Sequence, residues 1–276
     1  MRLDAYLAKN YPEQSRSTWQ KIIEDGFVQV NGKTADKKTR ASDQDTIDIK
    51  KFQKTIAPID IPIIYEDDNV VVMDKPVGVL THAKGALSEE FTVADFVASK
   101  ITDKDFRNSS NRPGIIHRLD RATSGIIIVA KNPETAKLLT NQFADRKAHK
   151  TYLAMVKKAP KLESARIDLP IGRNPKRPSE FRVDPKGKPA ITDYKVVQLF
   201  NDGSALLELK PLTGRTHQLR VHLAHIGSPI IGDPVYGDAE SERMMLHAQE
   251  LEITIPDGQR KTFSTKIPHE FIRNES

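Results

Sequence analysis

The chain has 276 residues, a formal net charge of +6 at neutral pH and a sequence pI near 9.3. It contains no cysteine, which excludes a disulfide framework, a thiolate nucleophile and a cysteine-ligated metal. No apolar run is long enough to predict a membrane span, and the N-terminus lacks the apolar core of a signal peptide, so we expect a cytoplasmic protein with no membrane partner. The length suits one large domain with a small one, and the positive charge suits a polyanionic partner.

The first fifty residues predict a small unit of helices and short strands. Ser15 or Ser17 can cap a second helix, because both hydroxyls stand just before its first residues. Val28 and Val30 alternate with polar residues as in a half-buried strand, and the Asn31-Gly32 pair is typical of a two-residue hairpin turn. We therefore predict a small domain over 1–50, followed by a polar, basic and proline-interrupted linker over 51–60.

Residues 61–276 show strand patterns interrupted by a few helices. Apolar or alternating runs predict strands over 70–73, 126–130, 152–156, 192–199 and 205–209. Apolar side chains three and four apart predict a helix over 135–143, and a further helix before Gly227 and Pro229. Because strands and helices do not alternate regularly, we predict an α+β fold with a mixed, mostly antiparallel sheet.

The segment from Gly114 to Gly125 places one carboxylate, Asp120, between Arg118 and Arg121. This polar loop feeds directly into the apolar strand at 126–130. A rigid strand that carries a charged loop is a good platform for a site, so Asp120 is the candidate reactive group. A simple hydrogen-bonded turn would show the same short pattern.

A second charged segment, from Lys210 to His225, follows about a hundred residues later. Leu219, Leu223 and Ile226 recur at helical spacing and should face the core. Arg220 lies one position from Leu219, at the edge of that buried stripe. An arginine in such a place usually has an anionic partner.

These motifs resemble those of the RluA/RluD-type pseudouridine synthases. The matching segments are His117-Arg-Leu-Asp-Arg-x-Thr-Ser-Gly125, Gly214-Arg-Thr-His-Gln-Leu-Arg-Val-His222, Asp74-Lys75-Pro76 and Lys150-x-Tyr152-x-Ala154, in the family's order. The N-terminal unit resembles the αL RNA-binding module of a small-subunit ribosomal protein. Together these resemblances imply a catalytic domain over 61–276, with a central RNA cleft in its sheet.

The resemblance also implies roles for individual residues. Asp120 becomes the catalytic nucleophile or base, Arg220 the partner that keeps it ionised, and Tyr152 the ring that stacks on a flipped uracil. The substrate contacts would come from Arg118, Arg121, Lys75, Arg215 and His217. Further positive charge in the cleft would come from Arg146, Lys147, Lys150, Arg173, Lys176 and Arg177. In the N-terminal module, RNA contacts would come from Arg2, Arg16, Lys21, Lys37 and Lys38.

Three alternatives belong to other functions or substrates. A non-catalytic RNA-binding or ribosome-assembly factor would share the charge and the N-terminal module, but should have lost Asp120, Tyr152 or Arg220. A glycosidase-like hydrolase would need two carboxylates flanking one bond. A tRNA-directed synthase would share every motif, whereas the RluD-like layout favours 23S ribosomal RNA or a precursor ribosomal particle.

We expect neither a cofactor nor a metal. Pseudouridine formation is an isomerisation that needs no redox group. His222 and His225 have no Asp or Glu nearby in sequence, and His117 and His222 suit hydrogen-bonded structural roles. We also expect a monomer.

Overall fold

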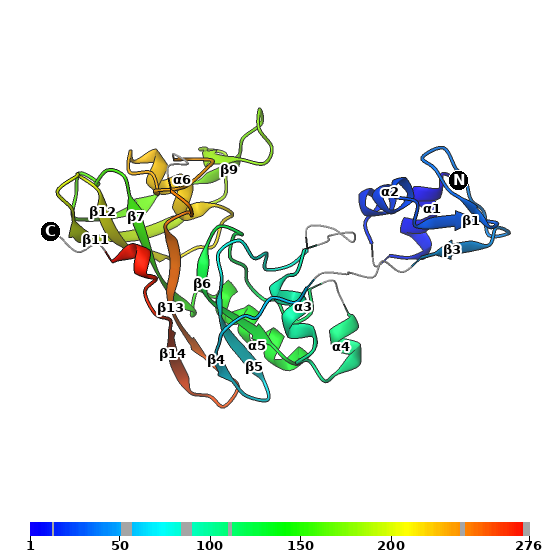
Figure 1. Ribbon diagram of the computed structural model, residues 1–276, viewed down its shortest axis with the longest axis horizontal. Helices are drawn as coiled ribbons and strands as arrows, with labels where there is room; N and C mark the ends of the chain where they lie inside the picture. Colours follow the sequence, from blue (N-terminus) through cyan, green and yellow to red (C-terminus); the bar gives the residue numbers. More distant parts are fainter. Residues whose placement is uncertain (13, 51–56, 84–89, 110–111, 238–240, 273–276) are drawn as a thin grey trace.

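The computed structural model of the chain describes residues 1–12, 14–50, 57–83, 90–109, 112–237 and 241–272 (Figure 1). Most of the predicted linker, residues 51–56, lies outside the described residues, so the boundary at 51–60 stays a prediction.

Residues 1–50 form their own sheet over two helices. The elements are α1 (Leu3–Asn10), α2 (Arg16–Glu24), β1 (Val28–Val30), β2 (Lys33–Thr34) and β3 (Ile47–Ile49), with strand order β2-β1-β3. Ser15, rather than Ser17, caps α2, because its hydroxyl accepts a hydrogen bond from the Thr18 amide. Asn31 and Gly32 both have positive φ, at 52° and 77°, as the predicted hairpin turn requires. The apolar side chains of both helices pack on this sheet and form a separate core.

The larger part of the chain is built on one nine-stranded sheet, as Figure 1 shows. Its strands are β4 (Ile63–Glu66), β5 (Val70–Lys75), β6 (Ser124–Ala130), β7 (His149–Val156), β8 (Ser164–Asp168), β11 (Ile191–Leu199), β12 (Ala205–Pro211), β13 (Leu246–Thr254) and β14 (Arg260–Ser264). The order is β4-β5-β6-β13-β7-β12-β11-β8, and β14 pairs with β13. Every pair is antiparallel except β6 with β13. The predicted α+β class with a mixed, mostly antiparallel sheet is confirmed.

Helices and a small hairpin complete this part. They are α3 (Val93–Ala98), α4 (Lys104–Asn108), α5 (Pro133–Ala144), α6 (Gln218–His225), the 3₁₀ turn η1 (His269–Phe271), and the hairpin of β9 (Ile171–Arg173) with β10 (Phe181–Val183). The helices predicted over 135–143 and before Gly227 correspond to α5 and α6. Leu139 of α5 packs with apolar residues of β6, and Leu219 and Leu223 of α6 pack with those of β7 and β12.

One row of paired residues crosses the centre of the sheet. Gly125 of β6 pairs with Ala248 of β13, Ala248 pairs with Tyr152 of β7, and Tyr152 pairs with Leu209 of β12. Because this register is fixed by backbone hydrogen bonds, the loop just before β6 and the segment after β12 are held beside Tyr152.

Candidate active site

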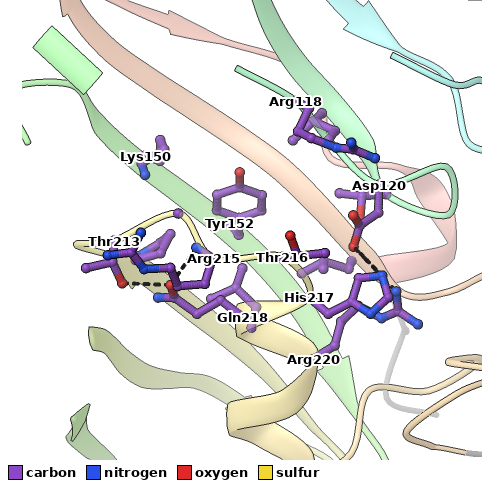
Figure 2. Close-up of a pocket in the computed structure, with 16 residues that line it drawn as sticks. Arg118, Asp120, Lys150, Tyr152, Thr213, Arg215, Thr216, His217, Gln218 and Arg220 are labelled. Carbon is purple, nitrogen blue, oxygen red and sulfur yellow. Dashed lines mark hydrogen bonds and ion pairs between the residues drawn. The ribbon is translucent and has the colours of Figure 1, made fainter. Parts of the chain in front are cut away.

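A cavity of about 120 Å³ opens beside this row, and both charged segments of the sequence line it. Asp120 comes from the loop before β6, Tyr152 and Lys150 from β7, and Arg220 from α6. Figure 2 shows the Tyr152 ring between Lys150 on one side and Asp120 on the other. Residues that are a hundred positions apart in sequence therefore meet in one pocket.

Two nitrogen donors face the carboxylate of Asp120. Nη1 of Arg220 lies 3.4 Å from Oδ2 of Asp120, and Nε2 of His217 lies 3.8 Å from the same oxygen (Figure 2). The Asp120 side chain keeps 21% of its surface exposed, while that of Arg220 keeps only 6%. The carboxylate is thus open to the pocket on one side and faces cationic or polar groups on the other.

The strongest contacts of Arg220 go to a residue that the sequence patterns did not single out. Its Nε and Nη2 donate to the two oxygens of Asp233, each at 2.7 Å, in a bidentate pair. Asp233 is fully buried, and its Oδ1 also accepts from the amides of Val235 and Tyr236. Burial by itself would raise the pKa of Asp233, but these contacts hold the pKa below its usual value. The predicted anionic partner of Arg220 is therefore Asp233 at close range, with Asp120 second.

His217 is fixed at the start of α6 in an unusual backbone conformation. Its φ is +57°, in the left-handed region that non-glycine residues seldom adopt. Nδ1 of its ring lies 2.9 Å from the hydroxyl of Tyr236. Burial lowers the pKa of His217, so the ring is neutral at neutral pH.

Tyr152 and Lys150 lie two positions apart on β7 and so share one face of the sheet. Burial, with the nearby charge of Asp120 second, raises the pKa of Tyr152, which keeps the phenol protonated. Burial lowers the pKa of Lys150 to about 8. Among the described residues, the Lys150 side chain has no hydrogen-bond or ion-pair partner. Its ammonium group is therefore available to a ligand.

Models of two known protein families match this chain. The model of the family described as RNA pseudouridylate synthase matches residues 69–225, and the S4 domain model matches residues 1–47. The chain belongs to the RNA pseudouridine synthase family. It is 37% identical to a protein of Borreliella burgdorferi named ribosomal large subunit pseudouridine synthase D, over 99% of this chain and 88% of that one. It is 34% identical to the protein of the same name from Escherichia coli, over 98% and 88% of the two chains.

A solved structure supports the same family. The human RNA pseudouridylate synthase domain containing 1 superposes with a TM-score of 0.61 at 29% identity, covering 75% of this chain and 83% of that chain. The family model's match over residues 69–225 includes Asp120, Tyr152 and Arg220.

Lys75 of the synthase does not fit its predicted role as a substrate contact. Its side chain is fully buried, and Nζ donates to the backbone carbonyls of Pro76 and Val79 at 2.9 and 2.8 Å. The carbonyl of Arg121, next to Asp120, lies 3.5 Å from the same nitrogen. Lys75 therefore bonds the backbone next to Asp120 and does not line the pocket.

The other predicted substrate residues lie at the pocket rim or beside it. Arg118 and Arg215 are exposed and line the cavity of the synthase, and Nε of Arg215 donates to the Pro189 carbonyl. Arg121 is paired with Glu90. Of the further cleft cations, Arg146 and Lys147 follow α5, whereas Arg173, Lys176 and Arg177 lie on the β9–β10 hairpin and its loop.

The five basic residues predicted to bind RNA in the N-terminal unit are all exposed. Arg2 and Arg16 both bond the buried carboxylate of Asp4, while their side chains keep 52% and 54% of their surface. Lys37 pairs with Glu24. Asp4 thus holds two guanidinium groups side by side at the surface.

The predicted structural histidines are confirmed in those roles. Nε2 of His117 accepts from the Ile128 amide at 3.0 Å, and its ring stacks on Phe143. His222 is buried between the Thr192 hydroxyl and the Leu169 carbonyl. Within the described residues, no group of three or more His, Cys, Asp or Glu could hold a metal, and no helix is long and apolar enough to cross a membrane.

Proposed function

We propose that this synthase converts specific uridines of large-subunit ribosomal RNA to pseudouridine, and that Asp120 acts on the ribose of the target nucleotide. The printed names of the relatives from Borreliella burgdorferi and Escherichia coli support the substrate. The observation that carries the proposal is the Asp120 carboxylate, open to the pocket and faced by Arg220 at 3.4 Å.

The reaction breaks one bond to the base and forms another. The bond from ribose C1′ to uracil N1 breaks, and its electron pair leaves with the base. Asp120 assists either by attacking C1′, with the bond between them broken again when C5 attacks, or by removing a ribose proton, which returns to the ribose as C1′ bonds to C5. The base turns, C1′ bonds to C5, the C5 proton is released and N1 takes up a proton. The nucleotide gains and loses no atom overall. The side chains of the pocket therefore need only hold the reacting groups, stabilise charge and transfer protons.

The neighbours of Asp120 suit both routes. Arg220 places a positive charge beside the carboxylate and fixes its direction. Tyr152 offers a protonated phenol ring on which a flipped uracil can stack, a contact worth about 1–3 kcal/mol. Arg118 at the rim can fill the space that the base vacates or hold a phosphate.

Replacing Asp120 by asparagine tests this proposal, because the amide can neither attack nor accept a proton. We expect Asp120→Asn to lower isomerisation by about a thousandfold or more, while RNA binding stays close to that of the wild type. Asp257→Asn, in the exposed turn between β13 and β14, is the matched control and should keep full activity. An Asp120→Asn protein that still converts uridine at a near-normal rate would overturn the role of Asp120.

Pseudouridine mapping of total RNA, from cells with and without the gene, tests the substrate. Loss of one site or a tight cluster in large-subunit ribosomal RNA is the expected result. Loss confined to tRNA would replace the proposed substrate. No loss at any position would favour a non-catalytic RNA-binding or ribosome-assembly factor instead. Repeating the assay with purified RNA and with precursor particles separates those two forms of the substrate.

A further inference from the structure

The Tyr236 hydroxyl connects the β9–β10 hairpin to the carboxylate of Asp120 through one histidine. It accepts a hydrogen bond from the Phe181 amide of β10 at 2.8 Å. On its other side it lies 2.9 Å from Nδ1 of His217. Nε2 of the same imidazole lies 3.8 Å from Oδ2 of Asp120. The series runs from a surface hairpin to the pocket through two hydrogen bonds and one longer contact.

The protons in this series can be assigned by counting donors and acceptors. A backbone N–H only donates, so the Phe181 amide occupies one lone pair of the Tyr236 oxygen. Among the described residues, the other polar partner of the phenol is Nδ1 of His217, and burial raises the pKa of Tyr236, so the hydroxyl keeps its proton. The carboxylate of Asp120 faces Nε2 and favours a proton there, which leaves Nδ1 to accept from the phenol. A neutral imidazole that accepts at Nδ1 carries its proton on Nε2.

We propose that Tyr236 is a positioning residue that fixes His217 as the Nε2–H tautomer and so presents a second proton donor to Asp120. The first donor is Arg220, which Tyr236 also contacts, since the guanidinium carbon lies 5.0 Å above the phenol ring. Tyr236 thus touches both groups that face the carboxylate. This inference rests on the proposed function of Asp120 for its kinetic consequence, but not for its proton assignment.

The ring packing around His217 supports the same role. The imidazole meets the rings of Tyr236 and Phe181 edge-on, each with centroids 5.6 Å apart. Because two aromatic rings and one hydrogen bond fix its plane, the imidazole has one orientation toward Asp120. The 3.8 Å separation is longer than a hydrogen bond, and we expect it to shorten when RNA is bound.

The tautomer can be read directly, without any assay of activity. Histidine is labelled with ¹⁵N, and the two ring nitrogens of His217 are assigned by comparison with His217→Gln. In the wild type we expect a neutral ring protonated at Nε2. In Tyr236→Phe, which lacks the donor to Nδ1, we expect a mixture of both tautomers or a proton on Nδ1. A wild-type ring protonated at Nδ1, or an unchanged tautomer in Tyr236→Phe, would overturn the proposal.

Kinetics then test whether the tautomer matters to Asp120. We expect Tyr236→Phe to lower kcat about tenfold, as for one hydrogen bond to a charged group, with little change in KM. Tyr65→Phe is the matched control, since its hydroxyl bonds Asp67 far along the chain from the pocket segments. A double-mutant cycle adds His217→Gln, whose amide can donate from the Nε2 position. In the His217→Gln background, Tyr236→Phe should have almost no further effect on kcat. If Tyr236→Phe lowers kcat as much there as in the wild type, Tyr236 does not act through His217.

The two proposals fail in different ways. If Asp120 is not the catalytic group, Asp120→Asn keeps its activity while the ¹⁵N signals of His217 still show the Nε2–H tautomer. If Tyr236 does not position His217, Asp120→Asn is inactive and the tautomer does not respond to Tyr236→Phe.

Discussion

The carboxylate of Asp233 determines how Arg220 faces Asp120. Arg220 is buried, and its Nε and Nη2 donate to Asp233. Its Nη1 is therefore directed at Asp120. A buried guanidinium without its carboxylate would be an uncompensated charge. The guanidinium that faces Asp120 is thus oriented by Asp233, which does not line the pocket.

Removing the charge of Asp233 should therefore damage both stability and turnover. For Asp233→Asn we expect a loss of about 3–5 kcal/mol in the free energy of unfolding, together with a lower kcat, measured by urea denaturation and single-turnover rates. Arg166 and Asp193 form a bidentate pair with similar distances, 2.7 and 2.9 Å, but at the surface. Asp193→Asn should cost less than about 1 kcal/mol. An equal loss of unfolding free energy in the two variants would show that burial does not strengthen the pair of Arg220 with Asp233.

Lys150 gives the pocket a charge that depends on pH. Its pKa is lowered to about 8 by burial, so the ammonium loses its proton as pH rises from 7 to 9. Because the cation attracts an anionic ligand, RNA affinity should fall over that range, by about tenfold if one charged contact is lost. Lys150→Met should bind weakly and show little of this pH dependence, and Lys150→Arg should bind well throughout. A Lys150→Met protein whose affinity still falls as steeply would assign the titration to another group.

The resemblance to the synthase motifs implied that Asp120, Tyr152 and Arg220 belong together, and the pocket does contain all three. The sequence reading did not predict Asp233 or Tyr236, which lie between α6 and β13. No spacing marks these two residues, because their partners lie on α6 and β10 and meet them only in the folded chain. The burial of Lys75 was missed for the same reason.

At the scale of elements, the parallel contact between β6 and β13 holds the site together. Gly125 has a φ of +113°, and a Cβ there would lie 2.2 Å from the backbone oxygen of Ala248. Only glycine allows the two strands to approach this closely. Since Ala248 also pairs with Tyr152, this contact sets the distance between the Asp120 loop and β7.

An added methyl group at this contact should separate the strands. We expect Gly125→Ala to cost about 3 kcal/mol or more, from strand overpacking and the positive φ together, and to lower activity in whatever folds. Gly203→Ala is the matched control, because Gly203 also has positive φ, +80°, with no atom within 4 Å of a Cβ. It should cost about 1–2 kcal/mol and leave the rate unchanged. Urea denaturation and single-turnover rates compare the two.

The strand patterns could locate β5, β6 and β12, but not the central strand β13. In β6 all seven residues are buried, which yields a continuous apolar run. In β13 the polar His247, Gln249 and Glu250 interrupt the pattern, and a register shift between Ala248 and Glu250 breaks the alternation. A bulge is a property of the paired strands, so one strand's sequence does not reveal it.

At the scale of the whole molecule, residues 1–50 have the sheet and the core of an independent unit. Asp4 lies beneath the exposed Arg2 and Arg16. Burial by itself would raise the pKa of Asp4, but hydrogen bonds from Gln20 and Arg16, with the charges of Arg16 and Arg2, lower it to about 2. The two guanidinium groups therefore keep a fixed spacing at any physiological pH, as a contact to two phosphates would require.

Deleting residues 1–50 should weaken RNA binding without unfolding the catalytic domain. Each phosphate contact that is lost should reduce the slope of log affinity against log salt by about 0.7–0.9. The point variants Arg2→Ala with Arg16→Ala should remove a part of that slope, whereas Lys158→Ala with Lys161→Ala, exposed after β7, serves as the matched control. Binding titrations at several salt concentrations measure the slopes, and thermal unfolding follows the remaining domain. A soluble remainder with the full salt slope would exclude RNA contacts by residues 1–50, and an insoluble remainder would show that the boundary at 51–60 is misplaced.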